Sequence, residues 1–355
     1  MSAFYPLTIA TINRETKDCV SVEFDVQEAI KEKFKYLPGQ YLTLKLPIDG
    51  AEIRRSYSIC SSDLLNEKLA VAVKKVKQGK GSGYINDTLK VGDRLEVMTP
   101  MGNFHSPMTS SNKKTYVLFA GGSGITPMMS ILKSVLQIEP ESKIILFYGN
   151  EDEASIIFKK QLDQIAAKFK ERFKVVYILN KTESEQPDEN IGIMNLEKNT
   201  YLLNKRVDLS GDNEYFICGP TGMMDSAVAA LKEKKVDSTR IHVEYFSAPV
   251  LEEEKVSELT LVESEATIIC DGDEITVKLK AGETILEAAL AAGLDAPYAC
   301  QGGSCCTCRA KLTEGKVHMK VNYALLEKEV EEGFILTCQS QALSSKLVVD
   351  YDRGR

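Results

Sequence analysis

The stretch Cys300-Gln-Gly-Gly-Ser-Cys305-Cys306-Thr-Cys308 decides the interpretation of this chain, and a single Cys338 follows it downstream. The spacing C-x4-C-x2-C with a distant fourth cysteine is the ligand pattern of a plant-type [2Fe–2S] cluster. Such a cluster needs four thiolates, and one loop supplies three of them here. We therefore predict that the cluster ligands are Cys300, Cys305, Cys308 and Cys338.

Two details of this stretch bear on the prediction. A zinc knuckle or a disulfide pair would also use cysteines, but zinc sites favour two separated C-x2-C pairs, and only one such pair is present. Cys306 breaks the regular count. Its use as a ligand would give C-x5-C-x-C, which fits no plant-type cluster, so we expect that it does not bind iron. Gly302 and Gly303 would let the backbone curl closely, because glycine reaches dihedral angles that a Cβ forbids.

Length and composition are those of a globular protein with more than one domain. The chain has 355 residues, of which 43% are hydrophobic and 27% charged, and this length indicates two or three domains. The first residues show no basic and apolar leader, and no apolar run approaches the ~20 residues that span a bilayer. Nine cysteines, four of them with metal-ligand spacing, suit a reducing compartment. We expect a cytoplasmic protein without membrane contact.

The charge of the chain is unevenly distributed. The formal net charge is −7, and residues 259–355 carry an excess of acidic side chains. An acidic module argues against a nucleic-acid partner, which needs basic surface. It permits electrostatic docking to a basic protein face, although the same acids would also serve solubility alone.

The pattern of the sequence predicts three domains. Residues 1–108 contain short alternating apolar runs between turn residues, which is typical of an antiparallel β-barrel. In residues 109–247 strands alternate with helices, which predicts a doubly wound parallel α/β sheet. Residues 248–258 are acidic, contain Pro249 and have the character of a linker. Residues 259–355 form a third unit around the cysteine loop.

Within the α/β domain, individual elements can be assigned. We expect helices over residues 127–136, 154–169 and 221–234, and a polar loop over residues 181–190. In the third unit, Asp271-Gly272-Asp273 is the turn of an expected hairpin. A short amphipathic helix is expected over residues 284–292.

The β domain carries two candidate phosphate- and ring-binding segments. In Arg55-Ser-Tyr57-Ser58 the strand period places Arg55 and Tyr57 on one face and the serines on the other. Arginine offers a fork of donors to phosphate, tyrosine can stack on a flat ring, and serine can donate to a ring nitrogen. The segment from Gly79 to Gly83 could present backbone N–H groups to a pyrophosphate. Ordinary strand surface and a glycine-rich hairpin loop are the alternatives.

The α/β domain carries a nucleotide-binding pattern. Gly121-Gly-Ser-Gly-Ile-Thr-Pro127 follows the first strand of this domain and opens a helix. Its glycines permit close backbone approach, and the helix N-terminus favours phosphate. We expect Thr126 at the N-cap and Pro127 at the first helical position. Cys218-Gly-Pro ends a later strand, at the sheet edge where ligands bind in such folds.

Together these segments resemble the ferredoxin–NADP⁺ reductase superfamily over residues 1–247, and the C-terminal part resembles plant-type ferredoxins, which implies a β-grasp fold there. Further carriers of the resemblance are Glu244-Tyr-Phe246 and the segment 322–339. This domain order is similar to that of the reductase components of bacterial multicomponent oxygenases. The implied cofactors are FAD, NADPH or NADH, and a [2Fe–2S] cluster.

The resemblance implies a role for each matching residue. Arg55 would bind the FAD pyrophosphate, Tyr57 would pack on the flavin ring and Ser58 would lie near its N5 atom. Cys218 and Phe246 would border the nicotinamide and take part in catalysis with Tyr57 and Ser58. The other implied cofactor-binding residues are Val73, Lys74, Gly81 and Ser82 for FAD, and Gly122, Gly124, Thr126 and Gly219 for the nicotinamide nucleotide.

The choice between NADH and NADPH stays open in the sequence. Relatives often carry an arginine after Tyr-Gly-Asn, where it meets the 2′-phosphate of NADPH. Here Glu151 and Asp152 follow that tripeptide. An acid after the second strand suits a free ribose diol and repels a phosphate, although it would also suit a helix start. Lys181, after the third strand, could still bind a phosphate.

The function implied is an NAD(P)H-dependent oxidoreductase. Hydride would pass to FAD, and single electrons would pass through the cluster to an oxygenase protein of the di-iron or Rieske type. Residues 322–339 favour the reductase of an epoxidase. Another metalloprotein acceptor is an alternative. A second is a non-catalytic electron carrier that has lost hydride transfer, which the intact glycines and cysteines oppose.

Overall fold

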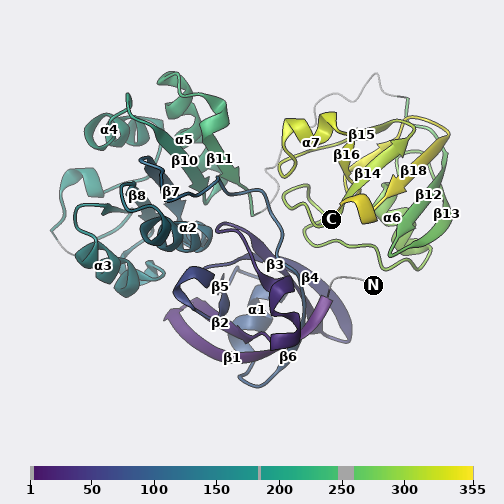
Figure 1. Ribbon diagram of the computed structural model, residues 1–355, viewed down its shortest axis with the longest axis horizontal. Coiled ribbons are helices and arrows are strands. Elements are labelled where there is room, and N and C mark those ends of the chain that lie inside the picture. The colour runs from purple at the N-terminus through teal and green to yellow at the C-terminus, as the bar shows by residue number, and fades with distance from the viewer. Residues whose placement is uncertain (1–3, 183–184, 247–259, 355) are drawn as a thin grey trace.

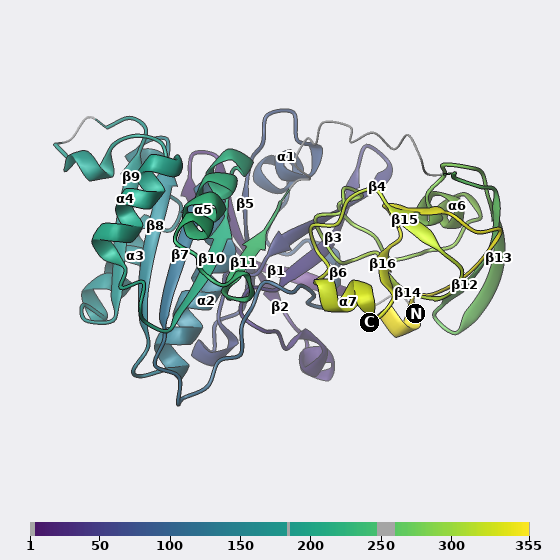
Figure 2. The same cartoon turned by 90° about the horizontal axis from the view of Figure 1, so that it is seen from above.

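A computed structural model of the chain describes residues 4–182, 185–246 and 260–354. The predicted linker, residues 248–258, lies outside the described residues. Figure 1 shows three bodies, each built around its own sheet, and Figure 2 shows the N-terminal body between the other two. No described helix is both long and apolar enough to cross a membrane.

The N-terminal body is the predicted antiparallel barrel. Its six strands follow the order β4-β3-β6-β1-β2-β5, and a bridge between Ile59 and Val71 joins the two outer strands. One helix, α1, covers an opening of the barrel beside β3 and β5. The elements are β1 Phe4–Thr16, β2 Cys19–Asp25, β3 Tyr41–Ile48, β4 Ala51–Ser58, β5 Leu69–Lys74, α1 Lys80–Asp87 and β6 Arg94–Met98, with 3-10 turns at Glu28–Phe34 and Asp63–Leu65.

The second body is the predicted parallel sheet with helices on both faces. Its strand order is β11-β10-β7-β8-β9. Alternate side chains of β7 serve opposite faces: Leu118 packs with helices α2 and α3, and Phe119 packs with α4 and α5. The elements are β7 Thr115–Gly121, α2 Ile125–Ile138, β8 Lys143–Asn150, α3 Lys159–Lys168, β9 Phe173–Leu179, α4 Leu196–Arg206, β10 Asn213–Cys218, α5 Thr221–Glu233 and β11 Ile241–Glu244.

Two local expectations for this body were wrong, and one helix was not predicted. Helix α2 begins at Ile125, with Gly124 as its N-cap, so Thr126 lies inside the first turn. The expected helix over 154–169 is split, because Phe158 adopts a positive φ of 61° and α3 begins only at Lys159. Helix α4 was not predicted. It has a polar exposed face, and its Asn195 N-cap is the signal that was available in the sequence.

The third body is a mixed sheet of the order β13-β12-β18-β14-β16, with α6 packed against it. The predicted hairpin turn is present, with Asp271 and Gly272 both at positive φ, and Thr284 caps α6 with a capping box. The elements are β12 Ser264–Cys270, β13 Asp273–Leu279, α6 Ile285–Ala291, β14 Arg309–Glu314, β15 Val317–Met319, α7 Glu327–Glu331, β16 Phe334–Leu336, β17 Ser340–Ala342 and β18 Lys346–Asp350.

Candidate functional site

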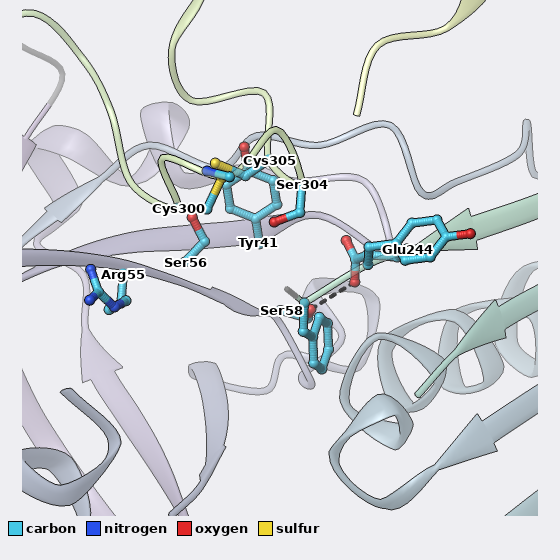
Figure 3. A pocket seen from close by; sticks show the side chains of 11 residues that line it. Tyr41, Arg55, Ser56, Ser58, Glu244, Cys300, Ser304 and Cys305 are labelled. Carbon is cyan, nitrogen blue, oxygen red and sulfur yellow. Dashed lines mark hydrogen bonds between the residues drawn. The ribbon is translucent and has the colours of Figure 1, made fainter. Parts of the chain in front are cut away.

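One pocket of about 250 Å³ is lined by all three bodies. Figure 3 shows its walls. The barrel contributes side chains of β3 and β4, the α/β body contributes the end of β11, and the third body contributes the cysteine loop. Its lining residues are Tyr41, Arg55, Ser56, Ser58, Glu244, Tyr245, Phe246, Cys300, Gly302, Ser304 and Cys305.

Strand β4 divides its side chains between two surroundings. Ser58 is buried and its hydroxyl donates to a carboxyl oxygen of Glu244 at 2.9 Å. Arg55 is exposed, and its guanidinium donates to the carbonyl of Arg54 at 2.7 Å. The remaining N–H groups of Arg55 are therefore accessible to an anion. Ser56 lies between these two residues and points toward Cys300 in Figure 3.

The start of helix α1 packs directly on this strand. A Cβ at Gly81 would lie 3.2 Å from Arg55 Cγ and 3.2 Å from Tyr57 Oη, so a larger residue here would have to displace these side chains slightly. Burial raises the pKa of Tyr57 to about 12, so the phenol stays neutral. A positive guanidinium beside the first turn of a helix is an arrangement that suits phosphate oxygens. The residues present therefore fit a flavin nucleotide.

Three other residues that the sequence assigned to FAD face elsewhere with their side chains. Val73 is buried in the barrel core. The Ser82 hydroxyl accepts from the N–H of Val76 at 3.1 Å and donates to the carbonyl of Gly79 at 3.3 Å, which closes the turn before α1. Lys74 Nζ reaches the other body and lies 3.6 Å from the position of a Cβ on Gly122.

Glu244 is the site residue whose role sequence reasoning missed. Its carboxyl group lies in the pocket wall, and burial raises its pKa to about 8 against the hydrogen bond from Ser58. It is therefore largely protonated at neutral pH. Cys218 is its neighbour in the sheet. Burial, with the nearby Glu244, raises the pKa of that thiol well above its usual value. A glutamate ending an apolar strand was the available signal.

The glycine segment of the α/β body is sterically tight. A Cβ on Gly124 would lie 2.0 Å from the carbonyl oxygen of Cys218, and one on Gly219 would lie 2.8 Å from the N atom of Gly121. Gly122 has a positive φ of 51°. Thr126 is buried and its hydroxyl donates to the carbonyl of Ser123 at 3.0 Å. The structure thus brings both predicted nucleotide segments together at the carboxyl edge of the sheet.

The two candidate selectivity residues contact each other. Lys181 Nζ lies 2.6 Å from Glu151 Oε1, and Asn180 donates to Glu151 Oε2 at 2.9 Å. The hydrogen bond from Lys181 is the largest cause of the lowered pKa of Glu151. Lys181 and Glu151 therefore act on each other as an exposed ion pair.

The four predicted ligand cysteines form one cluster of thiols. Hydrogen bonds from Cys305 and Cys338 lower the pKa of Cys300, and a hydrogen bond from Cys338 lowers that of Cys308. None of these cysteines is in a disulfide. Among the described residues, no three or more His, Cys, Asp or Glu side chains are arranged to hold one metal ion. That finding is compatible with a [2Fe–2S] cluster, because four cysteines shared by two irons leave two for each.

The backbone around these thiols supports the same interpretation. The N–H of Gly302 points at Cys300 Sγ at 3.3 Å, and the amide of Gln339 donates to Cys338 Sγ at 3.4 Å. Gly303 has a positive φ of 73° and packs on Val321. Donors aimed at sulfur stabilise negative thiolates. Four thiols with such donors, three of them buried and Cys300 partly exposed, fit iron rather than a harder cation.

Three family models match the chain. They are an oxidoreductase FAD-binding domain over residues 6–106, an oxidoreductase NAD-binding domain over residues 118–229, and a 2Fe-2S iron-sulfur cluster binding domain over residues 268–343. The chain is also 39% identical to one of the subunits of 1,2-phenylacetyl-CoA epoxidase from Escherichia coli, over 99% of both chains. The chain belongs to the FAD- and [2Fe–2S]-containing reductase components of oxygenases.

Other relatives agree with this assignment. The ferredoxin reductase component of 3-ketosteroid-9-alpha-monooxygenase from Mycobacterium tuberculosis is 36% identical over 98% of this chain and 95% of its own length. The structure of phthalate dioxygenase reductase matches with a TM-score of 0.57 over 98% of both chains, at 24% identity, which shows the shared fold. This reductase is therefore an NAD(P)H oxidoreductase that binds FAD and a [2Fe–2S] cluster, as predicted.

We predict different outcomes for two neighbouring cysteines. Cys305→Ser should abolish cluster assembly, because one iron loses a thiolate. Cys306→Ser should keep iron and acid-labile sulfide at the wild-type ratio. Iron content and the visible spectrum of the purified proteins measure both. Loss of the cluster in the Cys306 variant would contradict the assignment of ligands.

Two glycines in the α/β body provide a matched test of the close approach. Gly124→Ala should destabilise the protein by about 1–3 kcal/mol, because the new methyl group meets a backbone carbonyl. Gly222→Ala, where a Cβ meets nothing within 4 Å, should be neutral or stabilise α5 by up to about 1 kcal/mol. Urea unfolding of both variants measures the difference. Equal effects would refute the steric explanation.

Proposed function

We propose that this reductase takes electrons from NADH and delivers them, one at a time, to the oxygenase component of a phenylacetyl-CoA epoxidase. The observation that carries the electron path is the shared pocket: Ser58 of the barrel, Glu244 of the nucleotide domain and Cys300 of the cluster loop line one cavity. When bound, FAD accepts hydride and releases single electrons, and the cluster carries one electron.

The barrel residues would hold and orient the flavin. Arg55 and the first turn of α1 bind the pyrophosphate, and Tyr57 packs beside them. Ser58 presents its hydroxyl at the reacting edge of the flavin ring. The other assigned residues would act less directly than Arg55 and Tyr57. Val73 would contribute through the backbone of its strand, and Ser82 shapes the turn before α1. Lys74 extends toward Gly122 of the α/β body.

The nucleotide would bind across the carboxyl edge of the parallel sheet. Gly122, Gly124 and Thr126 place the N-terminus of α2 against its phosphates, and Gly219 follows at the next strand. Cys218 and Phe246 flank the nicotinamide. Phe246 is 45% exposed, so it can cover the flavin until the nicotinamide arrives.

Glu244 and Ser58 would control charge at the point of hydride transfer. A neutral Glu244 places no negative charge beside an incoming hydride, whereas a buried carboxylate would oppose it. It also accepts the Ser58 hydrogen bond and so fixes the orientation of that hydroxyl. The pair therefore fixes the Ser58 hydroxyl and adds no negative charge to the pocket at pH 7.

The partner assignment rests on similarity over the whole chain. The relative from Escherichia coli is named as part of 1,2-phenylacetyl-CoA epoxidase and covers 99% of this chain. A Rieske-type or other oxygenase is the second candidate, since the monooxygenase reductase relative also spans nearly the whole chain.

The domain limits at residues 108, 247 and 258 belong to the same proposal. So does a cytoplasmic location, which agrees with nine cysteines that form no disulfide in the described residues.

An anaerobic titration with NADH and with NADPH tests the function and its nucleotide. We expect NADH to bleach the flavin and the cluster at a lower concentration than NADPH, because a 2′-phosphate near Lys181 would also meet Glu151. Glu151→Gln should reduce the preference for NADH over NADPH about tenfold or more. Glu171→Gln changes an exposed glutamate that is not part of the Glu151–Lys181 pair, and it should leave this preference unchanged. A preference for NADPH in the wild type would contradict the NADH proposal, and an unreduced flavin would favour the carrier alternative.

The protonation of Glu244 makes stability depend on pH. Its folded pKa of about 8 lies above the ordinary value of 4.5, so the folded state binds more protons between these values and loses stability as pH rises. Glu244→Gln removes this loss. The stability of the variant relative to the wild type should therefore increase from about pH 4.5 to about pH 8 in urea unfolding, and a constant difference would show that Glu244 is ionised in the folded protein.

A further inference from the structure

Cys306, which the cluster spacing left without a role, lies at the boundary between the third body and the barrel. It is 4% exposed, and burial raises the pKa of its thiol to about 11. Its neighbours Cys305 and Cys308 are predicted ligands, with Thr307 between Cys306 and Cys308. Any contact at positions 306 and 307 therefore acts directly on the loop that holds the cluster.

One side chain of the barrel makes that contact. The hydroxyl of Tyr41, on β3, accepts the backbone N–H of Cys306 at 3.1 Å. The same hydroxyl lies 3.2 Å from Cys306 Sγ and 3.1 Å from Thr307 Oγ1. Tyr41 is 5% exposed, so these bonds lie in a protected interface. Thr43, two residues along the strand, adds a contact of 3.2 Å to Thr307 Oγ1.

The hydrogen bonds connect the loop to the flavin-binding strand. Thr43 Oγ1 also contacts Ser56 Oγ at 3.1 Å, and Ser56 lies on β4 between Arg55 and Tyr57. Tyr41 itself pairs with Ser58 across the sheet. A short polar path thus runs from the proposed flavin site to the amide between two cluster ligands.

A second contact holds the domains together at a different place. Arg54 is 5% exposed. It donates to the carboxylate of Asp295 and to the carbonyl of Ala296 at 3.3 Å, and it stacks on Tyr298 with 4.5 Å to the ring centroid. This charged contact touches the segment before the cysteine loop. Arg54 can therefore hold the third body against the barrel, whereas Tyr41 fixes the position of the cysteine loop.

We propose that Tyr41 is a positioning residue that holds the cluster loop in register with the flavin pocket. Its hydrogen-bond partners in the loop are the backbone N–H of Cys306 and the hydroxyl of Thr307. The inference rests on the proposed electron path from flavin to cluster. Electron transfer falls steeply with distance, so a loop that is free to shift transfers electrons more slowly. Without the phenol oxygen, the buried N–H of Cys306 loses its acceptor, which favours departure of the loop from the barrel.

The test compares Tyr41→Phe with Tyr5→Phe in the full-length, cofactor-loaded protein. Tyr5 is a matched control in the same barrel, because its hydroxyl contacts the exposed Lys33 at 2.7 Å. Stopped-flow absorbance separates flavin reduction from cluster reduction after mixing with NADH. We expect Tyr41→Phe to slow the transfer step roughly tenfold relative to flavin reduction in the same variant, from the usual cost of an unpaired buried donor. Tyr5→Phe should leave it unchanged.

Hydrogen exchange provides a readout that needs no electron transfer. In Tyr41→Phe the amides of residues 304–308 should exchange faster than in the wild type, and Thr307→Val should give a smaller change in the same direction. Unchanged exchange and an unchanged transfer rate in Tyr41→Phe would overturn the proposal, as would equal slowing in the Tyr5 control. If the wild type reduced its flavin but never its cluster, the proposed function would fail, whereas faster exchange in Tyr41→Phe would still support the positioning role.

Discussion

The alternation of side chains along β4 is the constraint on which the site depends. In a strand, successive residues point to opposite sides. Arg55 and Tyr57 therefore meet Gly81 at the start of α1, whereas Ser58 meets Glu244 of the nucleotide domain. One short strand thus faces the start of α1, the proposed phosphate site, on one side and the proposed region of hydride transfer on the other. A slip of one residue in its register would exchange these partners.

Buried polar contacts, together with apolar packing of Tyr41 and Met101 against the core of the third body, hold the cluster domain on the barrel. The contact residues Tyr41 and Arg54 are almost fully buried and each has partners in the third body. Such bonds add little net stability, but each is costly to leave unmade. The docked arrangement is therefore specific in its geometry.

Local motifs could be predicted from the sequence because their chemistry depends on short spacing. The loop from Cys300 to Cys308 has its ligand pattern written in consecutive residues, and the segment from Gly121 to Pro127 combines a strand end with a helix start. The start of α2 was misplaced by two residues because Ser123 and Gly124 form a 3-10 turn that continues into the helix. Helix ends are commonly uncertain to this extent.

The contacts between domains could not be predicted in the same way. Tyr41 looks like an ordinary strand residue, and its partner at position 306 is separated from it by most of the chain. The raised pKa of Glu244 likewise arises from burial in a pocket that three bodies enclose. Sequence patterns of period two or 3.6 report burial against the nearest layer, so they carry no information on a wall supplied by another domain.

The shared pocket implies that flavin and cluster exchange electrons within a single chain. The most direct measurement is the rate of cluster reduction after anaerobic mixing with NADH, followed over a wide range of protein concentrations. A first-order rate constant that does not change with protein concentration is the result expected from the docked pocket. An observed rate constant that rises in proportion to protein concentration would mean transfer between molecules, and would contradict the account.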